Sequence, residues 1–136
     1  IWEIIHPRIK AIARSRFESN HYSDAVEAVF KELNTVIKNY VKRKTNEEYD
    51  GAKLMRRAFS PNNPLVLLGD LDSESGKSYQ NGFMDIFAGA IMGIRNPHAH
   101  DNLDTDKPKA IHLIYLASLL MYTFDERIEE SQLRSP

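Results

Sequence analysis

The segment Arg95-Asn96-Pro97-His98-Ala99-His100 holds the side chains that are best suited to chemistry on a phosphodiester. An arginine guanidinium offers five donors in a fixed geometry that matches phosphate oxygens, and an imidazole titrates near neutral pH. Ribose carries its own nucleophile, the 2′-hydroxyl. RNA can therefore be cleaved without a metal ion when one group removes the hydroxyl proton and another protonates the leaving oxygen, and such help is typically worth about 10²–10⁴ in rate. The segment predicts phosphate binding combined with proton transfer.

The same six residues also have a simpler interpretation. An arginine near a helix C-terminus often only compensates the helix dipole, and an Asn-Pro pair is a common helix stop. Because a proline disfavours helical geometry at the preceding residue, we expect the helix to end near Arg95 or Asn96, with both histidines in a loop. On the six residues alone, the helix stop is the favoured interpretation.

Other polar residues are candidates to support a site of this kind. Asp24 and Glu27 lie near the start of a predicted helix and could bond the arginine or the histidine across a cleft, although helix capping is the commoner role. Lys31 is a candidate for a phosphate contact, together with Arg56 and Arg57. An exposed helix face explains these three cations equally well.

A metal site is a weaker alternative. Enough nitrogen and oxygen ligands for a divalent ion occur at His98, His100, Asp101, Asp104, Asp106 and His112. However, aspartates that precede a helix are ordinary caps, and His112 belongs to an apolar helix. We expect no metal.

One segment partly resembles a nucleotide-binding loop, but its glycine spacing does not fit. Gly76-Lys77-Ser78 follows the apolar run Leu65-Val66-Leu67-Leu68, as in a phosphate-binding loop. Six residues separate Gly69 from Gly76, where that loop requires four. We therefore expect no bound cofactor.

The composition is that of an ordinary globular protein. The 136 residues fit one domain, and 42% hydrophobic residues predict a real core. With 18 Lys and Arg against 19 Asp and Glu, the formal net charge is -1, so any contact with RNA must be local. The absence of cysteine excludes disulfides and fits a reducing compartment, for which we expect the cytoplasm.

The start of the chain and its longest apolar run bear on targeting. The chain begins Ile1-Trp2-Glu3, without a methionine or a signal-peptide pattern, which predicts the C-terminal part of a longer protein. The apolar run 111–124 is shorter than the roughly 20 residues that span a bilayer. We expect it to be a core helix and expect no membrane contact.

Apolar residues at three- and four-residue spacing predict an all-α bundle of four or five helices. The predicted helices cover 2–17, 23–44, 52–59, 79–95 and 107–129. A short extended segment or hairpin is expected near 65–78. Gly82, Gly89 and Gly93 weaken the fourth helix by about 0.5–1 kcal/mol each relative to alanine, so we expect another backbone to approach it closely, as in a helix pair across a dimer.

Several motifs together resemble a known family. An arginine, usually followed by asparagine and then by a histidine after four to six residues, is the signature of the HEPN superfamily, and Arg95, Asn96 and His100 satisfy it. The chain is also similar to the abortive-infection branch labelled Ymh-like. That likeness rests on Trp2, His6-Pro7, His21-Tyr22, Asp24-Ala25-Val26, Ala28, Gly51, Leu54-Met55, Ala58-Phe59 and Gly89-Ala90-Ile91.

The resemblance implies a helical homodimer that brings two Arg–His motifs into one cleft and cleaves RNA without a metal, in toxin or phage-defence settings. Arg95 would bind the scissile phosphate, His100 would be the acid or base, and Asn96 would orient the phosphate, the ribose or His100. The spacing selects His100 over His98, which would at most contact the substrate. An antitoxin or an upstream regulatory domain would be a further partner.

The family also includes members without catalytic activity. The alternative function is therefore a module that binds nucleotide, RNA or a partner protein through the same cleft, and a third is a structural dimerisation domain.

Overall fold

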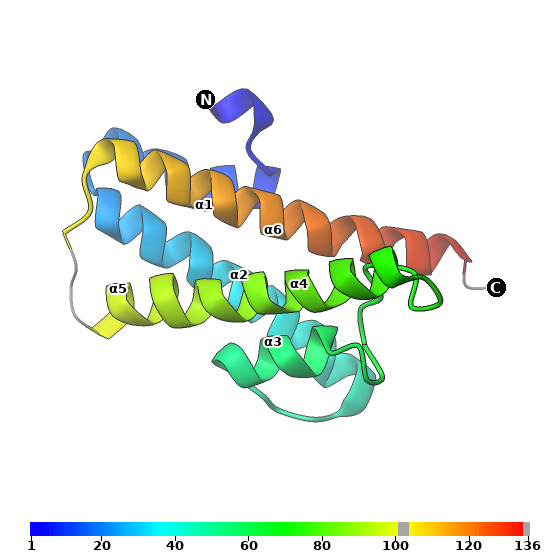
Figure 1. Cartoon of the computed structure of the whole chain (residues 1–136). Coiled ribbons are helices and arrows are strands. Elements are labelled where there is room, and N and C mark those ends of the chain that lie inside the picture. The colour runs from blue at the N-terminus through cyan, green and yellow to red at the C-terminus, as the bar shows by residue number, and fades with distance from the viewer. Residues whose placement is uncertain (101–103, 135–136) are drawn as a thin grey trace.

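The structure is a computed structural model that describes residues 1–100 and 104–134, and the side chains of residues 1–98 and 104–128. All of its regular elements are helical, as predicted, with no strand among these residues (Figure 1). In chain order the elements are the 3₁₀ turn η1 (Trp2–Ile4), α1 (Pro7–Glu18), α2 (Tyr22–Thr45), α3 (Gly51–Phe59), α4 (Glu74–Ala90), the π-helical segment η2 (Ile91–Arg95), α5 (Asn96–His100) and α6 (Lys107–Arg134).

Helix α2 is the central element of the bundle. It packs against α1, α3, α6, η2 and α5. Its buried side chains recur at intervals of three or four residues, which is the pattern of one broad apolar face: Ala25, Val26, Val29, Phe30, Leu33, Ile37, Tyr40 and Val41. Full burial of one large apolar side chain contributes roughly 1.5–3 kcal/mol. The core therefore lies around α2, and the other helices are placed by their contacts with it.

Helix α1 begins at Pro7, not at Trp2 as the spacing predicted. Pro7 occupies the first turn, where no backbone N–H is needed, and the residue before it is held in an extended conformation, with ψ 134° at His6. Residues 2–4 form a separate 3₁₀ turn above the bundle (Figure 1).

Helix α6 follows the predicted course. It begins after Asp106, whose carboxylate accepts a hydrogen bond from the Lys109 N–H at 2.9 Å. Ala110, Ile114, Ala117 and Met121 face the core. No helix in the described part of the chain combines the length and apolar character that crossing a bilayer requires.

The segment 60–73 is irregular, and no hairpin forms near 65–78. Helix α4 begins at Glu74, because the Ser73 hydroxyl accepts a hydrogen bond from the Gly76 N–H at 3.0 Å and so caps the helix earlier than predicted. Gly76 is also required sterically, since a Cβ at this position would overlap the carbonyl oxygen of Asp70.

The hydrogen bonds that a neighbouring strand would supply to this segment come from one buried side chain. Gln80 is fully buried, and its amide nitrogen donates to the carbonyl oxygens of Phe59 and Val66 at 2.7 and 3.1 Å. Its amide oxygen accepts from the N–H groups of Leu68 and Gly69 at 2.6 and 3.2 Å. The irregular backbone is thereby satisfied without a sheet.

Gln80→Leu should therefore lower the free energy of unfolding by about 3 kcal/mol, because buried backbone groups lose their partner at roughly 1–3 kcal/mol per unsatisfied group. Urea unfolding measures the change. The control is Asn81→Ala on the exposed side of the same helix, which should change stability little. A loss as small as that of the control would contradict the role of Gln80.

Candidate active site

The Arg95–His100 segment lies in a helix, and the predicted helix end near Arg95 is wrong. α4, η2 and α5 follow one another without a break, and Asn96 keeps helical angles of φ -64° and ψ -48°. The N–H of Asn96 donates to the carbonyl oxygen of Ile91, five residues earlier, which is the π-helical pattern.

The π turn explains how the helix passes Pro97. A proline has no N–H and its ring clashes with the carbonyl four residues earlier, so it normally kinks or breaks a helix. Here the wider turn 91–95 precedes the proline, and Pro97 becomes the second residue of a new α-helical register. The candidate residues are therefore presented from a helix of the core.

Arg95 is half-buried at the end of the π turn. Its Nη1 donates to the side-chain oxygen of Asn96 at 3.3 Å. Within the described residues this is the only hydrogen bond of the guanidinium, so most of its five donors are left for a ligand. Two of the three predicted catalytic residues are thus in direct contact. His100 ends α5, and its side chain lies outside the described side chains.

Asp50, a carboxylate that was not among the predicted site residues, precedes α3, and the amide of Asn34 donates to its Oδ1 at 2.6 Å. This hydrogen bond, helped by the positive charges of Lys38 and Arg95, holds the pKa of Asp50 below its ordinary value. In the sequence, Asp50-Gly51 looked only like the start of a helix.

His98 is buried, and both of its ring nitrogens are used within the fold. Nδ1 lies 2.7 Å from the carbonyl oxygen of Ile94, and Nε2 lies 2.8 Å from the Thr105 hydroxyl. A carbonyl can only accept, so Nδ1 donates, and in the neutral ring Nε2 accepts from Thr105. The Thr105 N–H donates in turn to the Ser23 hydroxyl at 2.6 Å. His98 therefore ties α5 to the segment before α6 and to the first turn of α2.

Among the described side chains, Arg95 forms no hydrogen bond or ion pair with the three supporting residues predicted on α2. Asp24 is exposed and pairs with the Arg16 guanidinium at 3.5 Å instead of capping α2, and that helix start has no side-chain cap. Glu27 is half-buried and Lys31 is exposed. A pocket of about 350 Å³ opens beside Asp24 at this end of the helix.

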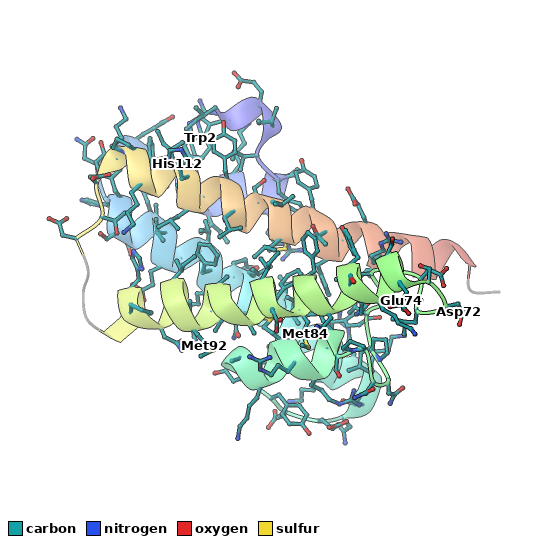
Figure 2. The ribbon with its side chains drawn as sticks, in the orientation of Figure 1. Trp2, Asp72, Glu74, Met84, Met92 and His112 are labelled. Atoms are coloured by element: carbon teal, nitrogen blue, oxygen red, sulfur yellow. The ribbon has the colours of Figure 1, made fainter. Side chains whose placement is uncertain are left out.

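The residues of the alternative metal site make separate local contacts. Asp106 caps α6, and His112 bonds the carbonyl oxygen of Pro108 at 2.8 Å on the surface of α6 (Figure 2). His100 and Asp101 lie outside the described side chains. Among the described side chains, no three histidine or acidic residues gather where one ion could bind them.

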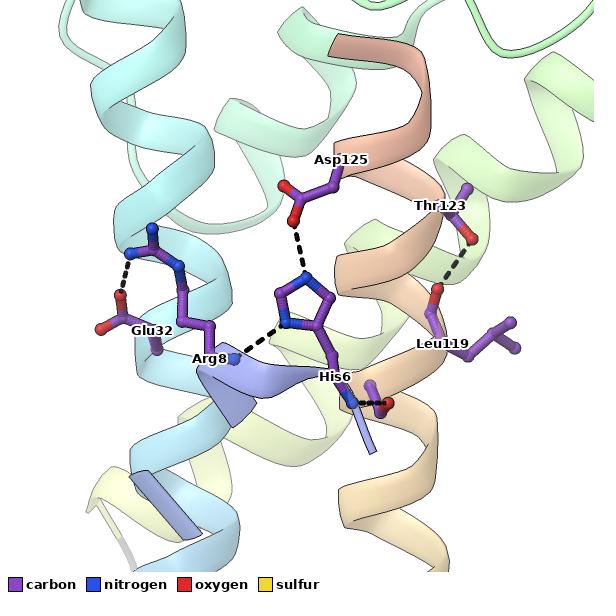
Figure 3. Close-up of polar contacts among 7 residues, drawn as sticks. His6, Arg8, Glu32, Leu119, Thr123 and Asp125 are labelled. Carbon is purple, nitrogen blue, oxygen red and sulfur yellow. Dashed lines mark hydrogen bonds and ion pairs between the residues drawn. The ribbon is translucent and has the colours of Figure 1, made fainter. Parts of the chain in front are cut away.

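A second buried histidine, His6, joins α1 to α6 (Figure 3). Its Nδ1 accepts a hydrogen bond from the Arg8 N–H at 3.0 Å, so the ring proton is on Nε2, which donates to Asp125 Oδ2 at 2.6 Å. The His6 N–H also donates to the Ser118 hydroxyl at 2.8 Å. A pocket of about 440 Å³ lies beside this pair. Because neither ring nitrogen is left to accept a proton from a substrate, His6 has a structural role.

We expect His98→Ala and Thr105→Val each to lower the free energy of unfolding by about 1–3 kcal/mol, since each leaves a buried partner unsatisfied. The double variant should cost less than the sum, because both changes remove one shared hydrogen bond. Urea unfolding of a double-mutant cycle tests this, with His112→Ala as the exposed control. Additive losses would contradict a shared tether.

Comparison with known proteins places the chain in a family. A family model described as "Protein of unknown function (Hypoth_ymh)" matches residues 3–123. No curated protein and no solved structure gives a significant match. The matched region includes all the helices up to α5 and most of α6. The chain therefore belongs to the Hypoth_ymh family.

Proposed function

We propose that this chain is a metal-independent endoribonuclease of HEPN type that acts in toxin or phage-defence (abortive infection) settings, with its site at a homodimer cleft. The observation that carries the proposal is the Arg95–Asn96 pair at the end of the π turn, with most guanidinium donors available. π turns inside α-helices are frequent at functional sites. The likeness of the Arg95, Asn96 and His100 spacing to the HEPN signature adds to this support.

The proposed reaction needs only groups of the protein and the RNA. The 2′-oxygen attacks phosphorus as its proton passes to a histidine, and the bond to the 5′-oxygen breaks as a second histidine protonates that oxygen. The products are a 2′,3′-cyclic phosphate and a 5′-hydroxyl. Arg95 stabilises the charge that develops on the phosphate, and Asn96 orients the guanidinium. In this scheme one His100 comes from each of two copies.

Support for a second copy comes from the exposed side of α4 and η2. A Cβ added at Gly82, Gly89 or Gly93 would have no atom within 4 Å. The close backbone approach expected from these glycines is therefore not made within the described part of the chain. Ile86 and Met92, which are close to these glycines in the sequence, are 43% and 55% exposed. Met92 is labelled in Figure 2.

The position of this face argues for a second copy as its occupant. Gly82 and Gly89 are seven residues apart, the repeat of a helix seam, and Gly93 lies in the π turn that carries Arg95. A partner seated on it would bring two copies of the motif close together. One surface would then serve both dimerisation and completion of the site.

The nuclease prediction is tested on 5′-labelled RNA with excess EDTA. We expect wild type to produce cyclic phosphate ends, and Arg95→Ala or His100→Ala to reduce the rate by about 10²-fold or more, because one residue stabilises charge and the other transfers a proton. Arg14→Ala and His112→Ala are the surface controls and should cleave like wild type, since Arg14 pairs with Glu18 on the surface of α1 and His112 lies on the surface of α6.

Three results would contradict the nuclease. Intact RNA after incubation with folded, dimeric wild type would do so, and binding of that RNA without cleavage would favour the non-catalytic binding module. Cleavage abolished by EDTA would support the metal site instead. Full activity in Arg95→Ala would remove Arg95 from the mechanism.

The dimer prediction is tested by light scattering of purified protein. Wild type should have twice the chain mass of 15.6 kDa. Ile86→Glu should be a folded monomer that cleaves RNA poorly, because a buried charge without a partner opposes association. Leu67→Glu is the control, since Leu67 is 54% exposed but lies outside α4. A monomeric wild type would contradict the prediction.

A further inference from the structure

Helix α6 has a second apolar side, which the described part of the chain leaves uncovered. Tyr115, Leu119 and Tyr122 are spaced by four and three residues, so they form one stripe along the helix, away from the core. Leu119 is 54% exposed and Tyr122 is 38% exposed. A helix that is apolar on all sides is normally buried on all sides. This set of three residues, which we call the outer stripe, is therefore a candidate contact surface.

The 3₁₀ turn η1 adds a further exposed apolar side chain next to α6. Two hydrogen bonds hold this part of the chain beside the helix. The Tyr115 hydroxyl donates to the carbonyl oxygen of Ile1 at 3.4 Å, and the His6 N–H donates to the Ser118 hydroxyl at 2.8 Å. Between these two contacts, Ile4 is 68% exposed. Apolar side chains that two elements expose together are typical of a surface that another protein covers.

The pocket beside His6 continues the outer stripe. It has a volume of about 440 Å³ and is lined by His6, Pro7, Tyr122, Asp125 and Glu126. Tyr122 thus belongs to both the stripe and the pocket. Its ring packs edge-on against the His6 ring, with 4.6 Å between the centroids, and this contact holds it as one wall. The stripe therefore leads into a recess that can admit a long side chain.

The chemistry of this pocket fits a cation. Asp125 uses only Oδ2 to accept from His6, and Glu126 is exposed, with no hydrogen bond or ion pair to another described residue. No lysine or arginine is among the lining residues. A tyrosine ring attracts a cation to its face, and carboxylates accept hydrogen bonds from ammonium or guanidinium groups. The same carboxylates repel the phosphates of RNA.

We propose that the outer stripe and this pocket together dock an amphipathic helix of a partner protein. Apolar side chains of the partner cover Leu119 and Tyr122, and one arginine or lysine enters the pocket between Tyr122, Asp125 and Glu126. Recognition of a helix through apolar anchors at three- and four-residue spacing is a common mode of protein binding. The interaction does not depend on RNA cleavage.

Charge and symmetry favour a different protein over a second copy of this chain. The outer stripe carries no lysine or arginine of its own, so a second copy that presented the same stripe would bring no cation to the pocket. The exposed face of α4 is already assigned to a second copy. If α6 bound another copy as well, association would continue beyond a dimer.

The test uses a fluorescent helical peptide of about 18 residues, with leucines at three- and four-residue spacing and one arginine among neutral residues. The control peptide has citrulline, which has the same shape without the charge. In fluorescence anisotropy, wild type should bind the arginine peptide about fivefold more tightly than the citrulline peptide. Glu126→Gln should remove most of this preference, and Leu119→Asp should weaken both peptides about tenfold or more.

Two variants control for general effects of charge and apolar exposure. Leu67→Asp changes a side chain that is also 54% exposed but lies outside α6, and Glu48→Gln removes an exposed carboxylate that pairs with Lys42. Both should bind the peptides like wild type. Circular dichroism checks that every variant is folded. If Leu119→Asp does not fold, the loss of preference in Glu126→Gln still decides the test.

Four results would overturn the proposal. They are equal binding of the two peptides by wild type, an unchanged preference in Glu126→Gln, wild-type affinity in folded Leu119→Asp, and no saturable binding at about millimolar peptide. A mass above that of the dimer in light scattering, lowered by Leu119→Asp, would also overturn it, since the occupant would then be a second copy.

Discussion

The hydrogen bond from the Asn96 N–H to the carbonyl oxygen of Ile91 is the constraint on which the candidate site depends. By spanning five residues instead of four, it allows the helix to continue through Pro97 into α5. The motif is then carried by the same helix that packs on α2 and α3. The backbone that carries these side chains is therefore held by the packing of the core. If the motif lay in a loop, binding of the ligand would have to order that backbone.

Hydrogen bonds between residues that are far apart in the sequence fix the neighbouring segments around this helix. Asn34 joins α2 to the start of α3, and the Ser23 hydroxyl joins α2 to Thr105 before α6. Gln80 holds the irregular segment that leads into α4. No buried side-chain nitrogen or oxygen in the described part of the chain lacks a hydrogen-bond partner. Since an unsatisfied buried group costs about 1–3 kcal/mol, these contacts select one arrangement of the helices over others that would bury the same apolar faces.

Much of the fold could be predicted from periodicity, because burial of one apolar face repeats along each helix. The helix observed at Gly51–Phe59 differs from the predicted one by a single residue. The errors arose where a non-local contact overrides a local signal. Pro97 signals a helix end, but the preceding π turn removes the clash. The partners of Gln80 and Asp50 come from distant segments, and nothing in local spacing reveals them. Arg95 and Asn96, as neighbours, could be paired from the sequence itself.

The contact between His98 and Thr105 joins α5 to the start of the segment before α6. Because Thr105 is also bonded to Ser23, breaking this contact would release the first turn of α2 at the same time. The two regions should therefore exchange their amide hydrogens as one cooperative unit, with a shared free energy of local unfolding. A molecule that bound only the opened form could change the conformation of the motif from the first turn of α2, without touching Arg95.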